Sequence, residues 1–290
     1  MKQKTKKLNP QIEKALKNKT ILITGGAGSV GSQLTSCLLD YSVKTVRVLD
    51  INENGLFQLG RSIKDKRLRL LLGSILDKER IEMAGNNADI IIHAAAIKNI
   101  EISEFNPIET IETNINGTVN MIKMAMMQKP KQFVNVSTDK AAEPSTLYGT
   151  TKQLGERLTS WTGLHDFDTK FCSVRFGNIF ETRGNVFEVW EEEKKKNLPL
   201  SITDPLMKRY LFHIDEAVNF ILKCLTISKG GEIFVPKMKS YPIKALASKI
   251  SKKHKIIGLR PGEKMDEILL SKEEKTIAKE LSDMWIIKKN

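Results

Sequence analysis

The 290-residue chain has 40% hydrophobic and 28% charged residues and a formal net charge of +13. This length suffices for one large or two smaller domains with a full hydrophobic core, and the composition is that of a globular protein. No apolar run approaches the roughly 20 residues that cross a bilayer, so an integral membrane protein is excluded.

The excess positive charge raises the question of nucleic-acid binding. The lysines are spread along the chain, however, and the densest run, Glu191–Lys196, predicts a helix with internal ion pairs. We therefore expect no nucleic-acid partner. The cysteines Cys37, Cys172 and Cys224 show no pairing pattern, and no apolar signal segment follows the basic start. Both features predict a cytoplasmic protein.

The predicted elements begin after a basic N-terminal extension, residues 1–19, in which Ile12 and Leu16 suggest a helix. Strands are then expected at 20–26, 45–50, 68–73, 88–96, 131–138 and 170–180, and helices at 30–42, 77–84, 110–127 and after Pro144. Apolar strands that alternate with helices are typical of a parallel sheet covered on both faces.

This alternation predicts an α/β fold with a doubly wound parallel sheet of the Rossmann type and a ligand crevice at the carboxyl ends of its strands. After about residue 178 short strands, turns and isolated helices follow. We assign residues 20–178, with a return segment near 206–235, to a nucleotide-binding domain. Residues 179–205 and 236–290 are expected to form a smaller C-terminal substrate-binding domain.

A glycine-rich turn, ITGGAGSVGS, joins the first predicted strand to the first predicted helix. Gly25, Gly28 and Gly31 allow backbone amides to approach a pyrophosphate at the positive end of the helix, which predicts a dinucleotide site. Asp50 ends the second strand, where a carboxylate accepts a hydrogen bond from a ribose 2′-hydroxyl and repels a 2′-phosphate. We therefore favour NAD over NADP, the alternative being that Asp50 only caps the next helix.

The segment STDKAAEPSTLYGTTK holds two pairs of proton-transfer groups. Tyr148 and Lys152 share a helix face, so the ammonium is expected to lower the pKa of the phenol. The phenolate can take a proton from a sugar hydroxyl while hydride leaves the same carbon. Asp139 and Lys140 are not needed for that redox step. They indicate a second reaction, unless they form an exposed surface pair.

Together, TGGAGSVG, STDKAAEPSTLYGTTK and SVRFGNIF resemble the extended short-chain dehydrogenases/reductases in order and spacing. The further segments LPLSITDPLMKRYLFHIDEAVNFIL and IIGLRPGEKMDEILLS resemble the UDP-N-acetylglucosamine (UDP-GlcNAc) 4,6-dehydratases that invert C5. The resemblance covers about residues 20–272. It implies a UDP-GlcNAc substrate, a tightly bound and recycled NAD or NADP, and a role in nucleotide-sugar and polysaccharide biosynthesis.

The resemblance also implies roles for the catalytic residues. Oxidation at C4 acidifies the C5 proton, Lys140 removes this proton, Asp139 protonates the departing 6-hydroxyl, and hydride returns to C6. Tyr148 serves C4, Lys152 tunes Tyr148 and holds the cofactor ribose, and Thr138 lies near O4. A lysine at position 140 implies C5 inversion, which gives UDP-2-acetamido-2,6-dideoxy-L-arabino-hexos-4-ulose.

Further binding residues follow from the same resemblance. The cofactor site is expected to include Gly25, Gly28, Ser29, Val30, Gly31, Asp50, Ala94, Ala95, Lys98, Tyr148 and Lys152. The substrate residues are expected to be Lys98, Asn178, Arg183, Arg209, Arg260 and Glu263, with Arg175 as a further phosphate-binding cation. The four histidines are scattered, so we expect no metal, and His93 is interpreted as a packed residue.

Two other functions remain open on the sequence alone. A UDP-sugar 4-epimerase or 4-ketoreductase would share the fold but would give Asp139 and Lys140 no purpose. A non-catalytic, basic nucleic-acid-binding protein would use only the net charge. Helices like the one that bears Tyr148 pair between subunits in this superfamily, so the resemblance implies a homo-oligomer, a dimer or a dimer-based hexamer.

Overall fold

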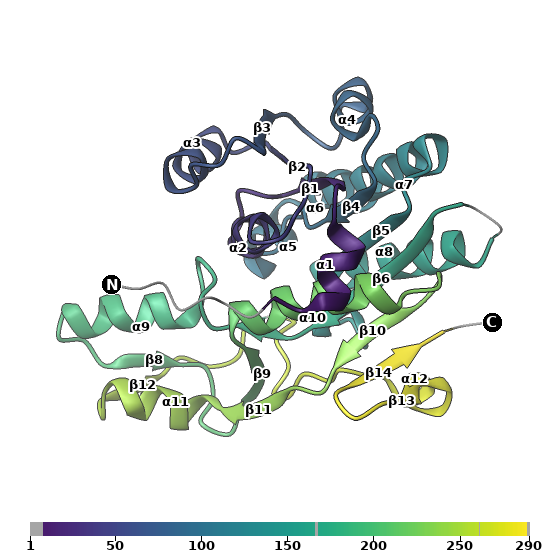
Figure 1. The fold of residues 1–290 in the computed structure, drawn as a ribbon. Coiled ribbons are helices and arrows are strands. Elements are labelled where there is room, and N and C mark those ends of the chain that lie inside the picture. The colour runs from purple at the N-terminus through teal and green to yellow at the C-terminus, as the bar shows by residue number, and fades with distance from the viewer. Residues whose placement is uncertain (1–7, 166–167, 261, 289–290) are drawn as a thin grey trace.

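The computed structural model describes residues 8–165, 168–260 and 262–288. A large sheet is covered by helices on both faces, and a smaller lobe that contains α9, α11 and two short sheets lies beside it (Figure 1). The predicted doubly wound α/β fold is confirmed.

The large sheet has the strand order β13-β14-β10-β6-β5-β4-β1-β2-β3. The strands from β3 to β10 run parallel, whereas β14 and β13 are antiparallel additions at one edge. The bounds are β1 Thr20–Thr24, β2 Thr45–Asp50, β3 Leu68–Leu72, β4 Ile90–His93, β5 Gln132–Thr138, β6 Lys170–Phe176, β10 Ile233–Pro236, β13 Lys279–Glu280 and β14 Met284–Ile287.

The two faces of this sheet bury separate apolar clusters. In β1, Ile21 and Ile23 point into one cluster and Leu22 into the other, because successive side chains of a strand alternate between faces. The first cluster is covered by α1 Pro10–Leu16, α2 Ser29–Leu39, α3 Glu53–Ser62 and α10 Ile214–Ile227. The second is covered by α4 Lys78–Gly85, α7 Gly117–Gln128 and α8 Leu147–Leu164, with α5 Ile100–Phe105 and α6 Pro107–Ile111 nearby.

Several predicted elements differ from the structure in detail. The helix expected at 110–127 is two helices, α6 and α7, joined by a π-helical turn, η1, at Glu112–Asn116. The strand expected at 170–180 is divided at Gly177 into β6 and β7, Asn178–Ile179. A Cβ at Gly177 would lie 2.7 Å from the Cβ of Tyr210, so only glycine lets the chain pass this close as it leaves the large sheet.

The small lobe is built on its own core around Trp190 and Leu246. Its strands are β7, β9 Lys208–Phe212 and β11 Lys239–Pro242 in one sheet, and β8 Leu200–Ile202 with β12 His254–Ile256 in another; its helices are α9 Val186–Lys195 and α11 Ile243–Ile250. In the run Glu191–Lys196, residues 191–195 are helical as expected and Lys196 is the C-cap of α9. Among the described residues, however, the run shows no internal ion pair, and Glu193 instead accepts a hydrogen bond from the backbone of Ser201 at 2.8 Å.

The C-terminal segment, residues 262–288, crosses from the small lobe back to the large sheet. After α12, Lys272–Ile277, strand β14 pairs with β10 and β13 pairs with β14, although residues 236–290 are expected in the substrate domain. The domain boundaries themselves remain predictions. What matters for the site is that this segment passes the carboxyl end of β6, where Arg175 donates a hydrogen bond to the carbonyl of Leu269 at 2.9 Å.

Candidate active site

The strand order reverses between β1 and β4, which is the point where open α/β sheets bind ligands. Gly25 follows β1 with φ +69°, and a Cβ there would lie 2.6 Å from the backbone of Ala95, which follows β4. The glycine is therefore required both by its backbone angle and by this close approach. The structure thus brings together Gly25, Ala94 and Ala95, three residues predicted at the cofactor.

The N-terminus of α2 faces the same edge of the sheet. Gly28 precedes the helix without a side-chain cap, no acidic residue lies in the first turn, and Gly31 packs against Gly25, where a Cβ would meet the Gly25 carbonyl oxygen at 2.5 Å. The backbone amides of Ser29 and Val30 therefore lie at a positive helix end, a suitable place for a phosphate group.

Asp50 is tied to this turn. Its Oδ2 accepts a hydrogen bond from the amide of Ala27 and its Oδ1 from the amide of Asn52, each at 2.9 Å. The alternative that Asp50 caps the next helix is wrong, because Asn52 caps α3 by accepting from the amide of Gly55 at 2.8 Å. The preference for NAD over NADP remains a prediction.

Two cations meet over the glycine-rich turn. The amide of Arg183 donates to Oγ of Ser29 at 3.0 Å, and its guanidinium donates to the carbonyl of Ala27. Lys98 donates to the carbonyl of Arg183 at 3.3 Å. Burial, then the nearby Arg183 charge, lowers the pKa of Lys98. Arg183 thus lies beside the predicted dinucleotide site, although the sequence placed it with the substrate residues.

The carboxyl end of β5 presents the acid–base pair. Asp139 begins a short 3₁₀ turn, η2 Asp139–Ala141, and its Oδ1 accepts from Oγ1 of Thr138 and from Nζ of Lys140, both at 3.0 Å. Its side chain is fully buried, and Oδ2 has no hydrogen-bond partner in the described part of the chain. The Lys140 side chain is 16% exposed. The alternative of an exposed surface pair is therefore wrong.

The start of α8 brings Tyr148 to this pair. Thr146 caps the helix by accepting from the amide of Gly149 at 3.1 Å. A Cβ on Gly149 would lie 2.6 Å from the carbonyl oxygen of Lys140, so this glycine lets the helix pack directly on η2. The first turn of α8 therefore holds Tyr148 beside Thr138 and Lys140. Lys152, four residues later, lies on the same face of the helix.

The ionisation of Tyr148 differs from the expectation. Burial raises the pKa of the phenol above its ordinary value, while the Lys140 charge and a hydrogen bond with Thr138 act in the opposite direction. The predicted lowering by Lys152 is wrong for this state of the protein. Burial lowers the pKa of Lys152 itself to about 8, against the attraction of Glu156. Because Lys152 is protonated to a smaller extent, it stabilises the Tyr148 phenolate less.

His93 is a packed residue at the end of β4, as its sequence position suggested. Its Nδ1 lies 2.7 Å from Oγ1 of Thr24, and its Nε2 lies 3.0 Å from Oγ1 of Thr118. Burial, and then the charge of Lys152, lowers the pKa of His93 to about 3. The imidazole is therefore neutral and held by two hydroxyl groups.

Arg175 was expected to bind phosphate, and this expectation is wrong. The guanidinium is buried between two carboxylates, Glu156 of α8 at 2.6 Å and Glu274 of α12 at 2.7 Å. It also donates to the carbonyl of Leu269. Because all the N–H groups of the guanidinium already donate, Arg175 connects the C-terminal segment to the large sheet and has no donor left for a phosphate.

Three of the remaining predicted substrate residues, Arg209, Arg260 and Glu263, meet at the loop around residue 263. Arg209 donates to Glu263 at 3.2 Å and to the carbonyls of Lys264 and Met265. Arg260 donates its amide to Glu263 at 3.3 Å, and Asn178 donates to the carbonyl of Tyr210 at 3.4 Å. Arg209 thus anchors this loop, and the roles of all four predicted residues toward a substrate remain predictions.

Two site residues were missed in the sequence. Glu267 lies 3.6 Å from Nζ of Lys140, and Gly177 leaves room for Asp139, since a Cβ there would lie 3.1 Å from Oδ2. Both lie in segments that carry the family resemblance, but their contacts with the acid–base pair arise only through the fold. Asn99, which follows Lys98, caps α5 by accepting from the amide of Ile102 at 3.0 Å.

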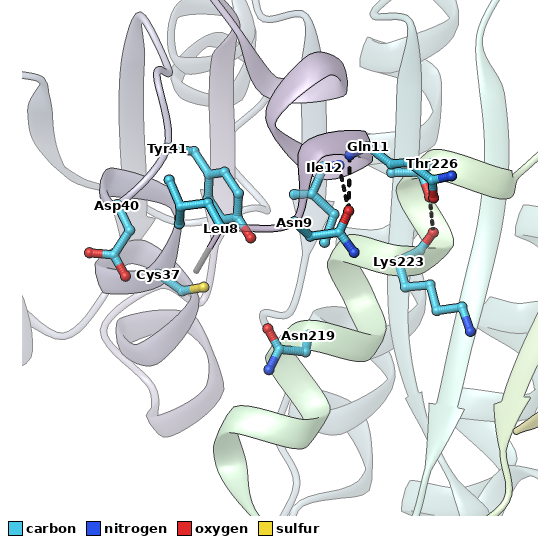
Figure 2. A pocket seen from close by; sticks show the side chains of 10 residues that line it. All are labelled: Leu8, Asn9, Gln11, Ile12, Cys37, Asp40, Tyr41, Asn219, Lys223 and Thr226. Atoms are coloured by element: carbon cyan, nitrogen blue, oxygen red, sulfur yellow. Dashed lines mark hydrogen bonds between the residues drawn. The ribbon is translucent and has the colours of Figure 1, made fainter. Parts of the chain in front are cut away.

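A separate hollow of about 380 Å³ lies between α1, α2 and α10 (Figure 2). Figure 2 shows Asn9 capping α1 there, with its side-chain oxygen accepting from the amides of Gln11 and Ile12. None of the predicted catalytic, cofactor or substrate residues lines this hollow. The chemistry therefore has to be sought at the end of the sheet and not at this cavity.

Within residues 8–165, 168–260 and 262–288, no cluster of three or more histidine, cysteine, aspartate or glutamate side chains is arranged to hold a metal ion. Over the same residues, no helix combines the length and the apolar character that a membrane span requires. Cytoplasmic localisation and a homo-oligomeric state remain predictions.

The family model described as polysaccharide biosynthesis protein matches residues 21–289. A Methanocaldococcus jannaschii protein described as an uncharacterized membrane protein is 42% identical over 93% of this chain and 86% of its own. A UDP-N-acetylglucosamine 4,6-dehydratase (inverting) from Campylobacter jejuni is 35% identical over 93% and 82%. A UDP-glucose 4-epimerase from Rickettsia bellii is 33% identical over 93% and 83%.

Solved structures show the same architecture. The X-ray structure of Pen from Bacillus thuringiensis has a TM-score of 0.91 and 36% sequence identity, and it covers 94% of this chain and 89% of its own. A dTDP-glucose 4,6-dehydratase from Streptomyces venezuelae, solved with NAD bound, has a TM-score of 0.78 at 22% identity over 89% and 90%. At that identity the second likeness shows the fold alone.

Proposed function

Because the chain belongs to the polysaccharide biosynthesis protein family of extended short-chain dehydrogenases/reductases, which act on nucleotide sugars as dehydratases or epimerases, we propose that it is a UDP-GlcNAc 4,6-dehydratase that inverts C5. The product is then a UDP-linked 4-keto-6-deoxy sugar of L configuration. The similarity to the Campylobacter enzyme supports this substrate and stereochemistry.

One observation carries the proposal, the buried Asp139–Lys140 pair beside Tyr148. Oxidation at C4 would need the dinucleotide as hydride acceptor and a proton acceptor at O4, and Tyr148 with Lys152 can supply the latter. Loss of water across C5 and C6 needs in addition a base at C5 and an acid at O6. Asp139 and Lys140 offer both groups next to Tyr148, and Oδ2 of Asp139 is buried without a partner.

The proton transfers balance within this pair. The neutral amine of Lys140 takes the C5 proton, the C5–C6 double bond forms, and the C6–O6 bond breaks. The acid form of Asp139 gives its proton to O6, so the hydroxyl leaves as water. The substrate displaces water from the site, which penalises both charges of the resting ion pair and favours the neutral amine and acid that this step requires.

The residues at the switch point fit a nicotinamide dinucleotide. Lys152 is only 6% exposed and, among the described residues, has neither a hydrogen bond nor an ion pair. A ribose diol would satisfy this ammonium, and the uncapped start of α2 would hold a pyrophosphate. When bound, the dinucleotide supplies the oxidation at C4 and returns the hydride to C6.

A UDP-sugar 4-epimerase is the second candidate, and the Rickettsia relative favours it. An epimerase uses the same C4 oxidation but returns the hydride to C4, so it breaks no bond at C5 or C6. It would leave the buried acid and amine without a task. Burying two ionised groups costs free energy. An epimerase reaction uses neither group and so gives no reason to retain them at the site, which makes this candidate the weaker one.

Product analysis in heavy water separates the two candidates. The full chain is incubated with NAD and UDP-GlcNAc in deuterium oxide, and the product is followed by proton NMR. We expect a new 6-methyl signal that is not split, because C5 takes a deuteron from solvent, with the L configuration at C5. UDP-N-acetylgalactosamine without a methyl signal would establish the epimerase instead. Tyr148→Phe is the control and should give neither product.

A further inference from the structure

We infer that Glu267 is a positioning residue for Lys140: its carboxylate, carried by the C-terminal segment, orients the Lys140 ammonium beside Asp139 and favours its protonated form. Oε1 of Glu267 lies 3.6 Å from Nζ of Lys140, which is also 3.0 Å from Oδ1 of Asp139. The inference deepens the proposed function and rests on it, since Lys140 is the proposed base.

Within the described residues, Lys140 is the one charged group that meets the buried Glu267 carboxylate. The Glu267 side chain is 7% exposed, and within the described residues its one hydrogen-bonding or ionic contact is the one to Lys140. A nearly buried carboxylate with a single partner at this distance is poorly compensated for its lost hydration. Burial of Glu267 therefore does little for stability, and its use must be sought in its effect on Lys140.

The backbone around Glu267 is fixed on both sides. The carbonyl of Met265 accepts hydrogen bonds from the guanidinium of Arg209 at 3.0 Å and from the amide of Lys208 at 3.2 Å. The carbonyl of Leu269 accepts from Arg175 at 2.9 Å. Two buried arginines thus hold the segment that presents Glu267, so the carboxylate reaches Lys140 from a rigid support.

The titratable groups that face Lys140 come from three elements. Asp139 lies on η2, Tyr148 lies on α8, and Glu267 lies on the C-terminal segment. Burial alone lowers the pKa of Lys140, but the Asp139 and Glu267 carboxylates more than offset this and raise it above its ordinary value. The resting amine therefore carries a proton, and it must lose this proton before it can act on C5.

Replacing Glu267 by glutamine keeps the shape and removes the charge. The ammonium of Lys140 then retains Asp139 as a partner, so no buried charge is left alone. With one carboxylate fewer, the apparent pKa of Lys140 should fall by roughly one to three units, the usual effect of one close opposite charge. The neutral amine then forms at lower pH, so the acid limb of the rate profile should move to lower pH as well.

The test measures Lys140 without any sugar. The full-length wild type, Glu267→Gln, Glu267→Asp and the control Glu273→Gln are labelled with trace acetic anhydride over a range of pH, and mass spectrometry quantifies acetylation of Lys140. We expect a lower apparent pKa in Glu267→Gln, a smaller change in Glu267→Asp, and none in Glu273→Gln, whose exposed side chain lies in the first turn of α12. Thermal unfolding should show Glu267→Gln to be at least as stable as the wild type.

Other results would overturn the inference. An unchanged labelling curve in a folded Glu267→Gln protein removes it, and so does a loss of thermal stability without a change in labelling. The dependence of kcat on pH with UDP-GlcNAc then tests the link to catalysis. If that sugar is not dehydrated while the labelling curve still shifts, the proposed function has failed and the contact between Glu267 and Lys140 stands.

Discussion

The two lysines of the candidate site lie in opposite surroundings, one at the end of β5 and the other in the second turn of α8. Lys140 has carboxylates at 3.0 and 3.6 Å, from Asp139 and Glu267, and its pKa is raised although burial acts against this. Lys152 has no hydrogen bond or ion pair among the described residues, and burial lowers its pKa to about 8.

This difference matches the two kinds of work that the proposed reaction requires. A lysine with two acids beside it belongs to a proton-transfer cluster, in which the charge is shared and can be redistributed when substrate enters. A buried lysine without a partner is suited to an external group, because it gains most from a ligand that supplies hydrogen-bond acceptors. The sugar and the cofactor ribose are the proposed ligands of the two regions.

The largest expected effect comes from removing the amine at the end of β5. Lys140→Met should lower the rate of 6-methyl formation by about 10²–10⁴-fold, because general acid–base groups contribute on that order. Oxidation at C4 depends on Tyr148 and Lys152 and should continue, so reduced nicotinamide should accumulate and absorb at 340 nm. The control is Lys123→Met, an exposed position on α7. Undiminished methyl formation in Lys140→Met would remove its assigned role.

The sequence predicted those parts of the site that are formed within short segments. The glycine-rich turn, the Asp139–Lys140 pair and the i, i+4 spacing of Tyr148 and Lys152 are local patterns, and the strand and helix periods place them at one edge of a parallel sheet. The structure brings them together at that edge. Local patterns sufficed here because the order of strands in this fold is itself regular.

The parts that sequence reasoning missed depend on contacts between distant segments. Arg175 looked available for phosphate until the fold placed Glu156 and Glu274 on its guanidinium. Glu267 lies in the segment IIGLRPGEKMDEILLS, but it reaches Lys140 only because the C-terminal segment returns to the large sheet. The predicted direction of the pKa shift of Tyr148 was wrong because the burial of its side chain depends on how α8 packs, which the local sequence does not show.

A second prediction is that Lys152 on α8 destabilises the cofactor-free protein. The ammonium of Lys152 is disfavoured in the folded state, so below pH 8 it lowers stability by at most about 3 kcal/mol, given a pKa near 8 against 10.5. Between pH 8 and about pH 10.5 the unfolded chain binds more protons than the folded chain, so the free energy of unfolding rises with pH. Above about pH 10.5 Lys152 is neutral in both states and the penalty is gone. Lys152→Met should therefore stabilise the cofactor-free protein most at neutral pH.

Urea unfolding at pH 7 and at pH 10 measures this effect, with Lys123→Met as the matched exposed lysine. The difference between Lys152→Met and the wild type should be larger at pH 7, whereas Lys123→Met should change little at either pH. A Lys152→Met protein that is less stable than the wild type at pH 7 would contradict the view that this lysine lacks a partner.

The smallest expected effect concerns the space around Asp139. In Gly177→Ala the new methyl group would lie 2.7 Å from the Cβ of Tyr210 and 3.1 Å from Oδ2 of Asp139, so the acid must shift. Overpacking of this kind lowers stability by roughly 1–3 kcal/mol, and a displaced catalytic group can reduce turnover about a hundredfold. Gly155→Ala is the control, since its methyl group would lie 3.6 Å from the nearest atom and alanine favours the interior of α8 by about 1 kcal/mol. Methyl formation and urea unfolding are measured for both variants. Full activity in Gly177→Ala would mean that Oδ2 of Asp139 does not need its present position. The contrast between a proton-transfer region and a cofactor-binding region would then lose its geometric support.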